Sequence, residues 1–154
     1  MTEPEERAER LITTNRKARH EYFILDSIEA GIVLTGTEVK SLRRTGASLA
    51  DGYADITNGE LWLRGVHINP YEQGSYANVD PVRNRKLLLH RKEIHRLAGR
   101  LAQQGLTLIP LKLYFKNNVA KVELGVAQGK RAYDKRQDIA RREMERSLKR
   151  QYAK

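Results

Sequence analysis

The chain has 154 residues, a mass of 17.7 kDa and 40% hydrophobic residues, which suits one compact core with extensions. It contains no cysteine, which excludes disulfides, thiolate chemistry and cysteine-ligated zinc, and no apolar run long enough to cross a bilayer. The net charge of +10 favours a large polyanion as partner. The acidic N-terminus does not resemble a signal peptide, so we expect a cytoplasmic protein.

Residues 1–14 mix acids and bases with few apolar anchors and predict a flexible N-terminal arm, with a helical turn around Leu11 and Ile12. β-branched and aromatic residues then become frequent. The elements expected there are a strand over Tyr22–Leu25, a turn near Ala30 and Gly31, and a second strand over Ile32–Leu34.

Two local motifs predict structure directly. Thr35 and Glu38 have the spacing of a capping box, and Gly46 supplies a stop, so a helix of about two turns is predicted between them. Asn58-Gly59 separates two β-rich runs within residues 52–68, and this pair best tolerates the positive φ angles of a tight hairpin turn.

A long polar loop is predicted over residues 69–85, which are rich in Pro, Gly and Asn. An amphipathic helix follows it and ends at Gly105. The apolar face of that helix consists of Ile94, Leu97, Ala98, Leu101 and Ala102.

Residues 107–128 alternate between apolar and polar around Asn117-Asn118, which predicts a second hairpin. Pro110 indicates an edge or a bulge. The expected inward faces are Ile109, Leu111, Leu113 and Phe115 on the first strand, and Val122, Leu124 and Val126 on the second. The whole pattern predicts a mainly β fold, an antiparallel barrel of the OB kind with about six strands and two to three helices. A two-layer α+β sandwich is the alternative.

The C-terminal residues 129–154 carry ten of the 29 Lys and Arg residues against four acids, a net charge of +6. Read as a helix, they place Ala140, Met144, Leu148 and Tyr152 on one narrow stripe. Because so narrow a stripe stabilises a helix poorly, the pattern predicts either a solvated charged segment or a segment that folds on a polyanion.

No motif indicates catalysis or a metal site. His90 and His95 are five residues apart, about 140° around a helix, so they cannot share a metal ion. Residues 125–131 resemble a phosphate loop but lack its spacing and the Ser or Thr after the lysine. We therefore expect no catalytic residue, no metal and no cofactor, with an RNA-processing or RNA-modifying enzyme module as the alternative.

Basic residues alternate with aromatic residues and amides in four places, a pattern that holds phosphates and stacks on unpaired bases. Two of them are the strand face with Lys112, Tyr114, Lys116 and Lys121, and the start of the tail at Lys130 to Arg136. The other candidate residues are Asn15, Arg16, Lys17, Arg19, His20, Tyr22, Arg83, Arg85 and Lys86.

Six segments, in order and spacing, resemble the SmpB family of bacterial SsrA-binding proteins. They are NRKARHEY, EAGIVLTGTEVKSLR, PVRNRKLLLH, LTLIPLKLYFKN, KVELGVAQGK and AYDKR, within residues 15–137. The resemblance implies an OB-fold body over residues 15–129 that binds the tRNA-like domain of transfer-messenger RNA (tmRNA). It also implies a basic tail over residues 130–154, helical when bound, that enters the ribosome. Such a complex rescues ribosomes stalled without a stop codon, by trans-translation.

Individual roles follow from the same resemblance. It implies that tmRNA is bound by Asn15, Lys17, His20, Glu29, Leu88 and Lys121. In the tail it implies contact with small-subunit rRNA at the decoding centre for Lys130, Arg131, Tyr133, Asp134, Lys135 and Arg136, and the apolar Met144 and Leu148 then lie in the empty mRNA channel. Elongation factor Tu would be met only through the charged RNA, no membrane would be bound, and the protein would be a monomer.

Overall fold

A computed structural model describes the backbone of residues 9–152 and the side chains of that range except 75–76, 131–138 and 151–152. The strands are β1 (Glu9–Thr14), β2 (Tyr22–Ile32), β3 (Ala47–Ser48), β4 (Tyr53–Thr57), β5 (Glu60–Arg64), β6 (His67–Ile68), β7 (Arg85–Leu88), β8 (Thr107–Lys116) and β9 (Val119–Gly129). The helices are α2 (Ala18–Glu21), α3 (Gly36–Arg44), the 3₁₀ helix η1 (Glu72–Ala77), α4 (Arg91–Gln104) and α5 (Lys130–Tyr152).

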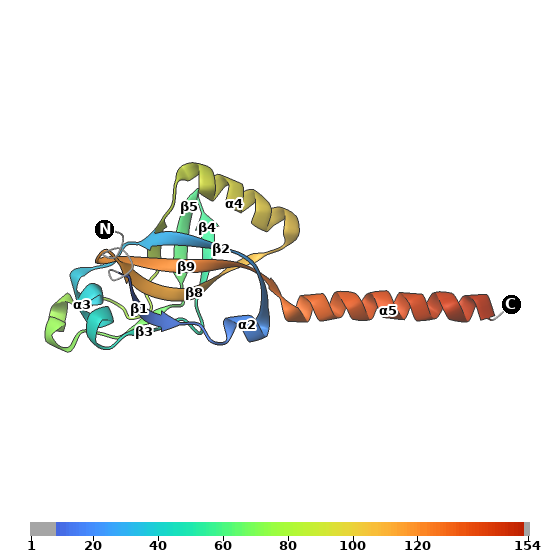
Figure 1. Cartoon of the computed structure of the whole chain (residues 1–154), viewed down its shortest axis with the longest axis horizontal. Helices are drawn as coiled ribbons and strands as arrows, with labels where there is room; N and C mark the ends of the chain where they lie inside the picture. Colours follow the sequence, from blue (N-terminus) through green and yellow to red (C-terminus); the bar gives the residue numbers. More distant parts are fainter. Residues whose placement is uncertain (1–8, 153–154) are drawn as a thin grey trace, which may run out of the picture.

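Antiparallel pairing closes the main sheet into a barrel (Figure 1). The order runs β8, β4, β5, β7, β2 and β9, and β9 pairs again with β8. β1 adds to β8 outside this ring, along Lys112–Lys116, while β3 and β6 form a separate two-stranded sheet. The predicted mainly β barrel is confirmed, and closure protects strand edges that an open sheet would expose.

Both predicted hairpins are confirmed, and their turns have the backbone angles that the sequence suggested. Asn58 and Gly59 have φ angles of 53° and 75° between β4 and β5. Asn117 and Asn118 have φ angles of 52° and 64° between β8 and β9. Positive φ at both central residues gives the turn the twist of the flanking strands.

β2 differs from the prediction because it is one continuous strand of 11 residues. The turn predicted near Ala30 and Gly31 is wrong, since both residues pair with β9 and Gly31 also pairs with Leu88 of β7. A Cβ on Gly31 would lie 3.4 Å from the Leu88 Cβ. This is an ordinary contact distance, so the glycine is not needed for packing, and local sequence cannot distinguish such a strand glycine from one in a turn.

Two further expectations need correction. The helical turn predicted around Leu11 and Ile12 is wrong, because these residues belong to β1, and the predicted arm joins the sheet from Glu9 onward. The loop predicted over 69–85 contains η1 and ends in β7. The closed ring has the six strands expected, and the described residues form three more, β1, β3 and β6, outside it. Short strands of this kind form because partner strands are already in place, which a local pattern does not show.

A β-bulge in β8 changes which residues face the core. The register shifts between Pro110 and Lys112, as the proline suggested, and leaves Leu111 as the extra residue. Leu113 therefore lies in the main core, whereas Ile109 and Leu111 pack in a second cluster under α2. The prediction that all four apolar residues of this strand share one face is wrong for that reason.

The predicted helices are confirmed with their ends. Thr35 and Glu38 form the reciprocal capping box of α3, and Gly46 follows it with φ 84°. α4 packs Leu97, Ile94 and Leu101 on the barrel and ends at Gly105, φ 61°. Ala102, predicted on this apolar face, is exposed instead. α5 extends away from the body as one long rod (Figure 1). None of the described helices combines the length and the apolar composition that a membrane span requires.

A buried ion cluster joins α3 to β7. The Glu38 carboxylate is 4% exposed and accepts a hydrogen bond of 2.6 Å from Arg85, which is fully buried. Arg85 also donates to the backbone oxygens of Val66, at 2.7 Å, and Pro81, at 2.9 Å, while Arg83 donates to the same carboxylate. Burial alone would raise the pKa of Glu38, but hydrogen bonds from Arg83, from the Thr35 backbone and from Arg85 lower it below its ordinary value.

We expect Glu38→Gln to lower the free energy of unfolding by about 3 kcal/mol, because it leaves the buried charge of Arg85 uncompensated. Urea unfolding followed by circular dichroism measures this change. Glu60→Gln is the control, since Glu60 forms an exposed pair with Lys86 at 3.6 Å and should change stability by less than about 1 kcal/mol. Equal effects of the two substitutions would contradict the importance given to the cluster.

The same cluster predicts a pH dependence. Because folding lowers the pKa of Glu38, its stabilising contribution is complete above the unfolded value of about 4.5 and is lost as pH falls through the folded pKa. The free energy of unfolding should therefore fall more steeply below about pH 4.5 in the wild type than in Glu38→Gln. Parallel pH profiles from urea titrations would show that other carboxylates dominate acid sensitivity.

Candidate nucleic-acid interface

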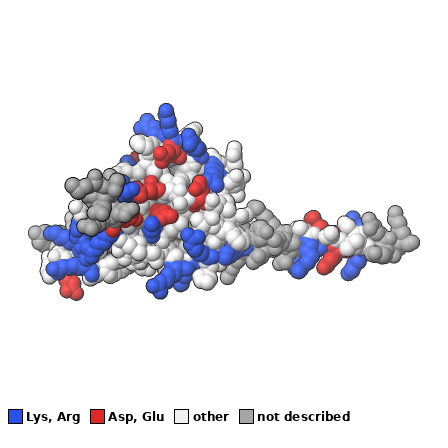
Figure 2. Space-filling view, in the orientation of Figure 1, with Lys and Arg blue, Asp and Glu red and all other residues white. Residues whose placement is uncertain are grey.

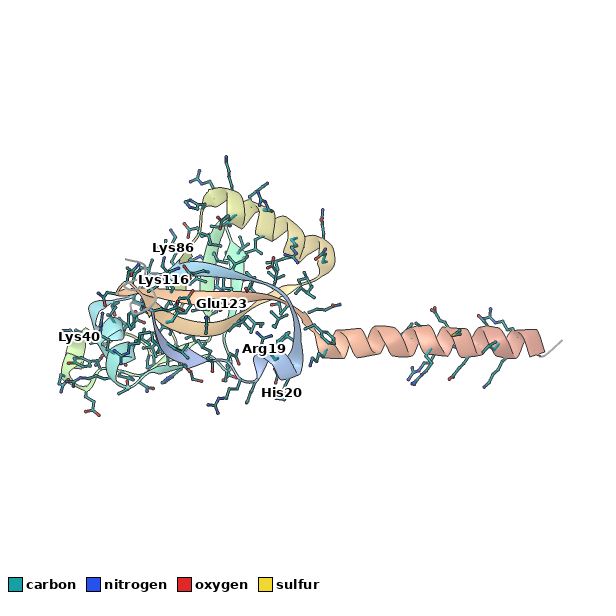
Figure 3. All side chains as sticks on the ribbon, viewed as in Figure 1. Arg19, His20, Lys40, Lys86, Lys116 and Glu123 are labelled. Atoms are coloured by element: carbon teal, nitrogen blue, oxygen red, sulfur yellow. The ribbon has the colours of Figure 1, made fainter. Side chains whose placement is uncertain are left out.

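α2 presents a cluster of cations at one end of the barrel. Ala18 is buried against Ile109 and Ala127, which fixes the single turn to the outside of β8 and β9. Around this anchor the side chains of Arg16, Lys17, Arg19 and His20 are exposed. Arg19 and His20 project from the lower edge of the body in Figure 3. The four predicted residues therefore lie together on one accessible surface, which we name the α2 surface.

Asn15 has a structural role beside that surface. Its side-chain amide donates to the backbone oxygens of Pro110, at 3.0 Å, and Leu49, at 3.3 Å, and its backbone N–H donates to Leu111. The side-chain nitrogen therefore uses its hydrogen bonds to connect the segment before α2 with β8 and with the turn before β4. Asn15 holds the α2 surface in place, and its predicted contact with RNA would have to use other atoms.

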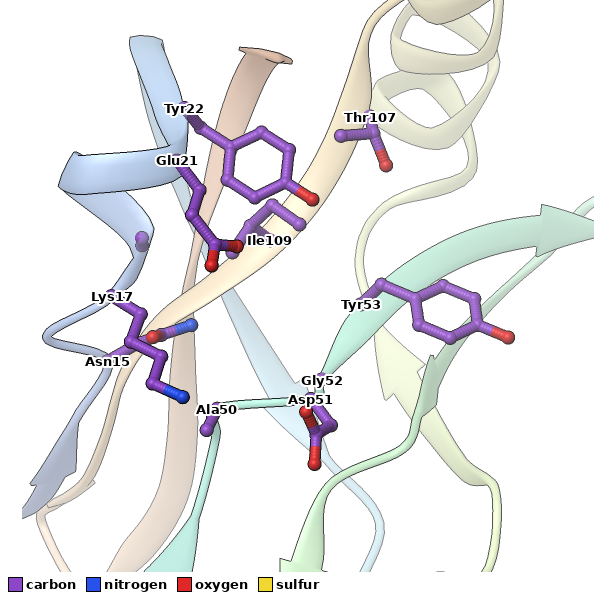
Figure 4. A pocket seen from close by; sticks show the side chains of 11 residues that line it. Asn15, Lys17, Glu21, Tyr22, Ala50, Asp51, Gly52, Tyr53, Thr107 and Ile109 are labelled. Carbon is purple, nitrogen blue, oxygen red and sulfur yellow. The ribbon is translucent and has the colours of Figure 1, made fainter. Parts of the chain in front are cut away.

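A pocket lies between α2 and the loop that leads into β4 (Figure 4). Its volume is about 370 Å³, and Tyr22 and Tyr53 lie on either side of its opening. The carboxylate of Glu21 points into it, and Lys17 lies at its rim near Ala50. Tyr22 was predicted from its position in a basic and aromatic cluster, but Tyr53 comes from a distant strand and no local motif indicates it.

A second surface runs across β7, β2 and β9. Gly31 in the middle strand pairs with Leu88 on one side and Lys121 on the other, so three neighbouring strands bring these positions together. Leu88 is 53% exposed, which is unusual for a strand leucine beside a closed core. Glu29 lies two residues along β2 and shares this outer face. We name Glu29, Leu88 and Lys121 the strand surface.

The Glu29 carboxylate is held by its neighbours on β8. The Tyr114 hydroxyl donates a hydrogen bond to it, and the Lys116 ammonium lies 3.7 Å away. Burial, together with this hydrogen bond, raises the pKa of Tyr114, so the phenol stays protonated at neutral pH and remains a donor. The contact aims one oxygen of Glu29 and leaves the carboxylate partly exposed as an acceptor for hydroxyl or base N–H groups.

The cations of β8 are less available than the sequence suggested. Lys112 lies 3.4 Å from Glu123 and 3.9 Å from Glu9, and its ammonium is 5.0 Å from the Tyr114 ring centroid. In Figure 2 acidic side chains lie over the middle of these strands, whereas Lys and Arg gather over the helices at the edges. The predicted basic strand face is therefore a mixed, internally paired surface.

The three cations before and within β7 have different environments. Arg85 is fully buried, so its predicted contact with RNA does not fit its position. Arg83 is half-buried and bound to Glu38, and Lys86 pairs with Glu60 at its exposed end. Arginine has the same appearance in a sequence whether it binds phosphate or an internal carboxylate, and only the fold separates the two.

The tail begins directly after β9. Lys130 donates to the backbone oxygen of Arg19 at 2.8 Å and lies 5.2 Å from the Phe23 ring centroid, so the first residue of α5 is fastened to the α2 surface. The side chains of Arg131, Tyr133, Asp134, Lys135 and Arg136 lie outside the described residues. Farther along, Met144 and Leu148 are 68% and 46% exposed, as a stripe without a protein core beneath it requires.

Comparison with known proteins identifies the family. A family model described as "SmpB protein" matches residues 12–154. The chain belongs to the SmpB family. It is 58% identical over 141 residues to an SsrA-binding protein of Acetivibrio thermocellus, with 92% of each chain covered. It is 59% identical over 142 residues to one of Desulforudis audaxviator, covering 92% of this chain and 93% of the relative.

A solved member of the SmpB family supports the same assignment in three dimensions. It comes from a structure described as "tmRNA-SmpB: a journey to the center of the bacterial ribosome". The two chains superpose with a TM-score of 0.64 at 56% sequence identity, over 76% of this chain and 82% of the other. The resemblance expected from the six sequence segments is therefore confirmed.

Asn15→Ala should lower the free energy of unfolding by about 1–3 kcal/mol, because the two backbone oxygens that its amide binds lose their buried donor. Thermal and urea unfolding measure this. Arg16→Ala is the matched control. Because Arg16 is exposed, this variant should have the free energy of unfolding of the wild type, within about 0.5 kcal/mol. An Asn15→Ala protein as stable as the wild type would assign Asn15 a purely binding role.

Proposed function

We propose that this protein is a non-catalytic adaptor that binds the tRNA-like domain of tmRNA and delivers it to stalled ribosomes in trans-translation. One observation carries the proposal: the chain shares 56% identity and its fold with a solved chain described as SmpB with tmRNA in the bacterial ribosome. The molecule has the two parts that this task needs. A closed body carries exposed recognition surfaces, and a basic helix extends from it (Figure 1).

The α2 surface supplies the phosphate contacts in this proposal. Arg16, Lys17, Arg19 and His20 are all exposed on or beside one turn of helix, so they can follow a bent single-stranded backbone. Tyr22 and Tyr53 next to them offer ring faces to unstacked bases. Loops of a tRNA-like fold present both chemistries together, which a regular duplex does not.

The strand surface supplies shape and hydrogen bonding. Leu88 offers an apolar contact for a sugar or a base face, Lys121 a charge, and Glu29 an acceptor aimed by Tyr114. A carboxylate repels phosphates but accepts hydrogen bonds from ribose hydroxyls and base edges. Glu29 therefore adds selectivity for a particular RNA conformation, while the cations add affinity.

The tail, residues 130–154, acts in the decoding centre and the empty mRNA channel. Its net charge of +6 would be neutralised by phosphates lining the channel. Lys130 to Arg136 lie nearest the body and would meet small-subunit rRNA first, with Met144 and Leu148 deeper in the channel. In this proposal the protein works in the cytoplasm as a monomer, needs no cofactor, and meets elongation factor Tu only through the charged RNA.

A chain that ends after Gly129 should bind tmRNA with nearly wild-type affinity but should not support addition of the peptide tag to stalled translation products. The body keeps its recognition surfaces, while the decoding centre and channel lose their occupant. Filter binding with labelled tmRNA measures the first result, and a reconstituted stalled-translation reaction measures the second. The same gels show whether the RNA is cleaved, which an enzyme would cause.

The matched control is a chain that ends after Tyr152, which keeps all of α5 and should tag normally. Normal tagging by the chain that ends after Gly129 would contradict the role of the tail. Loss of tmRNA binding in that chain would show that the tail, and not the body, supplies the primary affinity.

A further inference from the structure

α4 carries an outward stripe that neither recognition surface uses. Lys92, Arg96, Gly99 and Gln103 follow one another at intervals of three or four residues and are all exposed. At 100° per residue these four positions fall within about 60° of arc. The apolar residues that pack on the barrel occupy the opposite side of the helix. We name these four residues the α4 stripe.

The charge around the α4 stripe is largely uncompensated. Arg91, Lys92 and Arg96 are exposed and Glu93 is the one acid of the helix, and Figure 2 shows Lys and Arg gathered over α4. Among the described residues, the ion pair that α4 makes is between Arg100 and Asp26, at 3.1 Å. Within the same residues α4 contributes none of the large exposed apolar side chains, which argues against a lipid surface.

Gly99 is the feature that the fold does not explain. It lies inside a helix of 14 residues, where glycine is less favourable than alanine. A Cβ at this position would meet nothing within 4 Å, so packing within the chain does not require glycine. Because Gly99 has no side chain, the backbone of a partner can come close to the helix axis beside Lys92 and Arg96.

The α4 stripe leads into a shallow hollow at the C-terminal end of the helix. The hollow has a volume of about 520 Å³, and Gln103, Gln104 and Gln128 line it together with Leu25. Each amide both donates and accepts hydrogen bonds, which matches hydroxyl groups and base edges. Leu25 is 49% exposed there and offers an apolar contact for a ribose.

We propose that the α4 stripe and this amide hollow bind the minor groove of double-stranded RNA. The A-form minor groove is wide and shallow and displays 2′-hydroxyls beside its phosphates. Lys92 and Arg96 contact phosphates, Gly99 admits the ribose-phosphate backbone, and the glutamines hydrogen-bond to the 2′-hydroxyls. This surface is distinct from the α2 surface and the strand surface and goes beyond the proposed binding of tmRNA.

The position of the hollow fits an RNA environment. Gln128 lies two residues before the start of α5, so the hollow adjoins the root of the tail. α4 and α2 lie on opposite sides of that root in Figure 1. A duplex bound by α4 would therefore flank the tail on the side away from the α2 surface, and the body would be held between two RNA elements.

The test compares Gly99→Gln with Ala102→Gln, an exposed position of the same helix away from the stripe. Full-length proteins are titrated into a fluorescent RNA duplex of about 16 base pairs, and anisotropy gives the dissociation constant. Gly99→Gln should raise the melting temperature, because glutamine is a better helix former, yet weaken duplex binding several-fold. Ala102→Gln should leave both values near those of the wild type.

A second variant tests the cations that face the phosphates. Lys92→Ala/Arg96→Ala should lower the slope of log affinity against log salt by about 2, because two phosphates are then no longer neutralised by the protein. A DNA duplex of the same sequence should bind more weakly than the RNA duplex, because it lacks the 2′-hydroxyls. Wild-type duplex affinity in Gly99→Gln, or equal affinity of the wild type for the two duplexes, would overturn the proposal.

The same variants separate this proposal from the proposed function. Binding of the isolated tRNA-like domain of tmRNA should be unchanged by Gly99→Gln, because that RNA is assigned to other surfaces. If the wild type failed to bind tmRNA, the proposed function would be contradicted, while a loss of duplex binding confined to Gly99→Gln would still support the α4 surface.

Discussion

The body depends on one carboxylate. Glu38 closes the first turn of α3 through the Thr35 N–H, at 2.9 Å, and also binds Arg83 and Arg85. Arg85 carries the connection to two backbone oxygens, that of Val66 just before β6 and that of Pro81 in the loop between β6 and β7. A chain without disulfides thus fastens a helix, two strands and a loop with charge-assisted hydrogen bonds, which are stronger and more directional than neutral ones. The arrangement is sensitive, because loss of one partner leaves buried charge behind.

This cluster also explains how a chain of such high charge divides its cations. Some arginines and lysines hold the fold together: Arg85 is buried, Arg83 is bound to Glu38, and Lys112 lies between two acids. Others are exposed: among the described side chains, Arg16, Lys17 and Arg19 lie on or beside α2, and Arg91, Lys92 and Arg96 lie on α4. The separation matters for RNA recognition, because a cation already paired inside the fold contributes little to counterion release.

Structure that is decided locally is predictable from the sequence. The Asn58-Gly59 turn and the Thr35–Glu38 capping box each need only a few neighbouring residues, and both were placed correctly. Structure that depends on a residue distant in the sequence is not predictable in this way. Gly31 is a strand residue because β7 and β9 pair on either side of it, and β1 is a strand because β8 offers an edge. For the candidate site, the exposed cations near α2 were predictable from their cluster, whereas the burial of Arg85 and the position of Tyr53 beside the pocket depend on the closed barrel.

The junction between β9 and α5 has a mechanical consequence. The strand ends at Gly129 and the helix begins at Lys130, which is fastened to the Arg19 backbone oxygen, so the two elements meet without a flexible linker. A helix of 23 residues is about 34 Å long. Once the body is docked, the far end of α5 therefore lies at a set reach and direction.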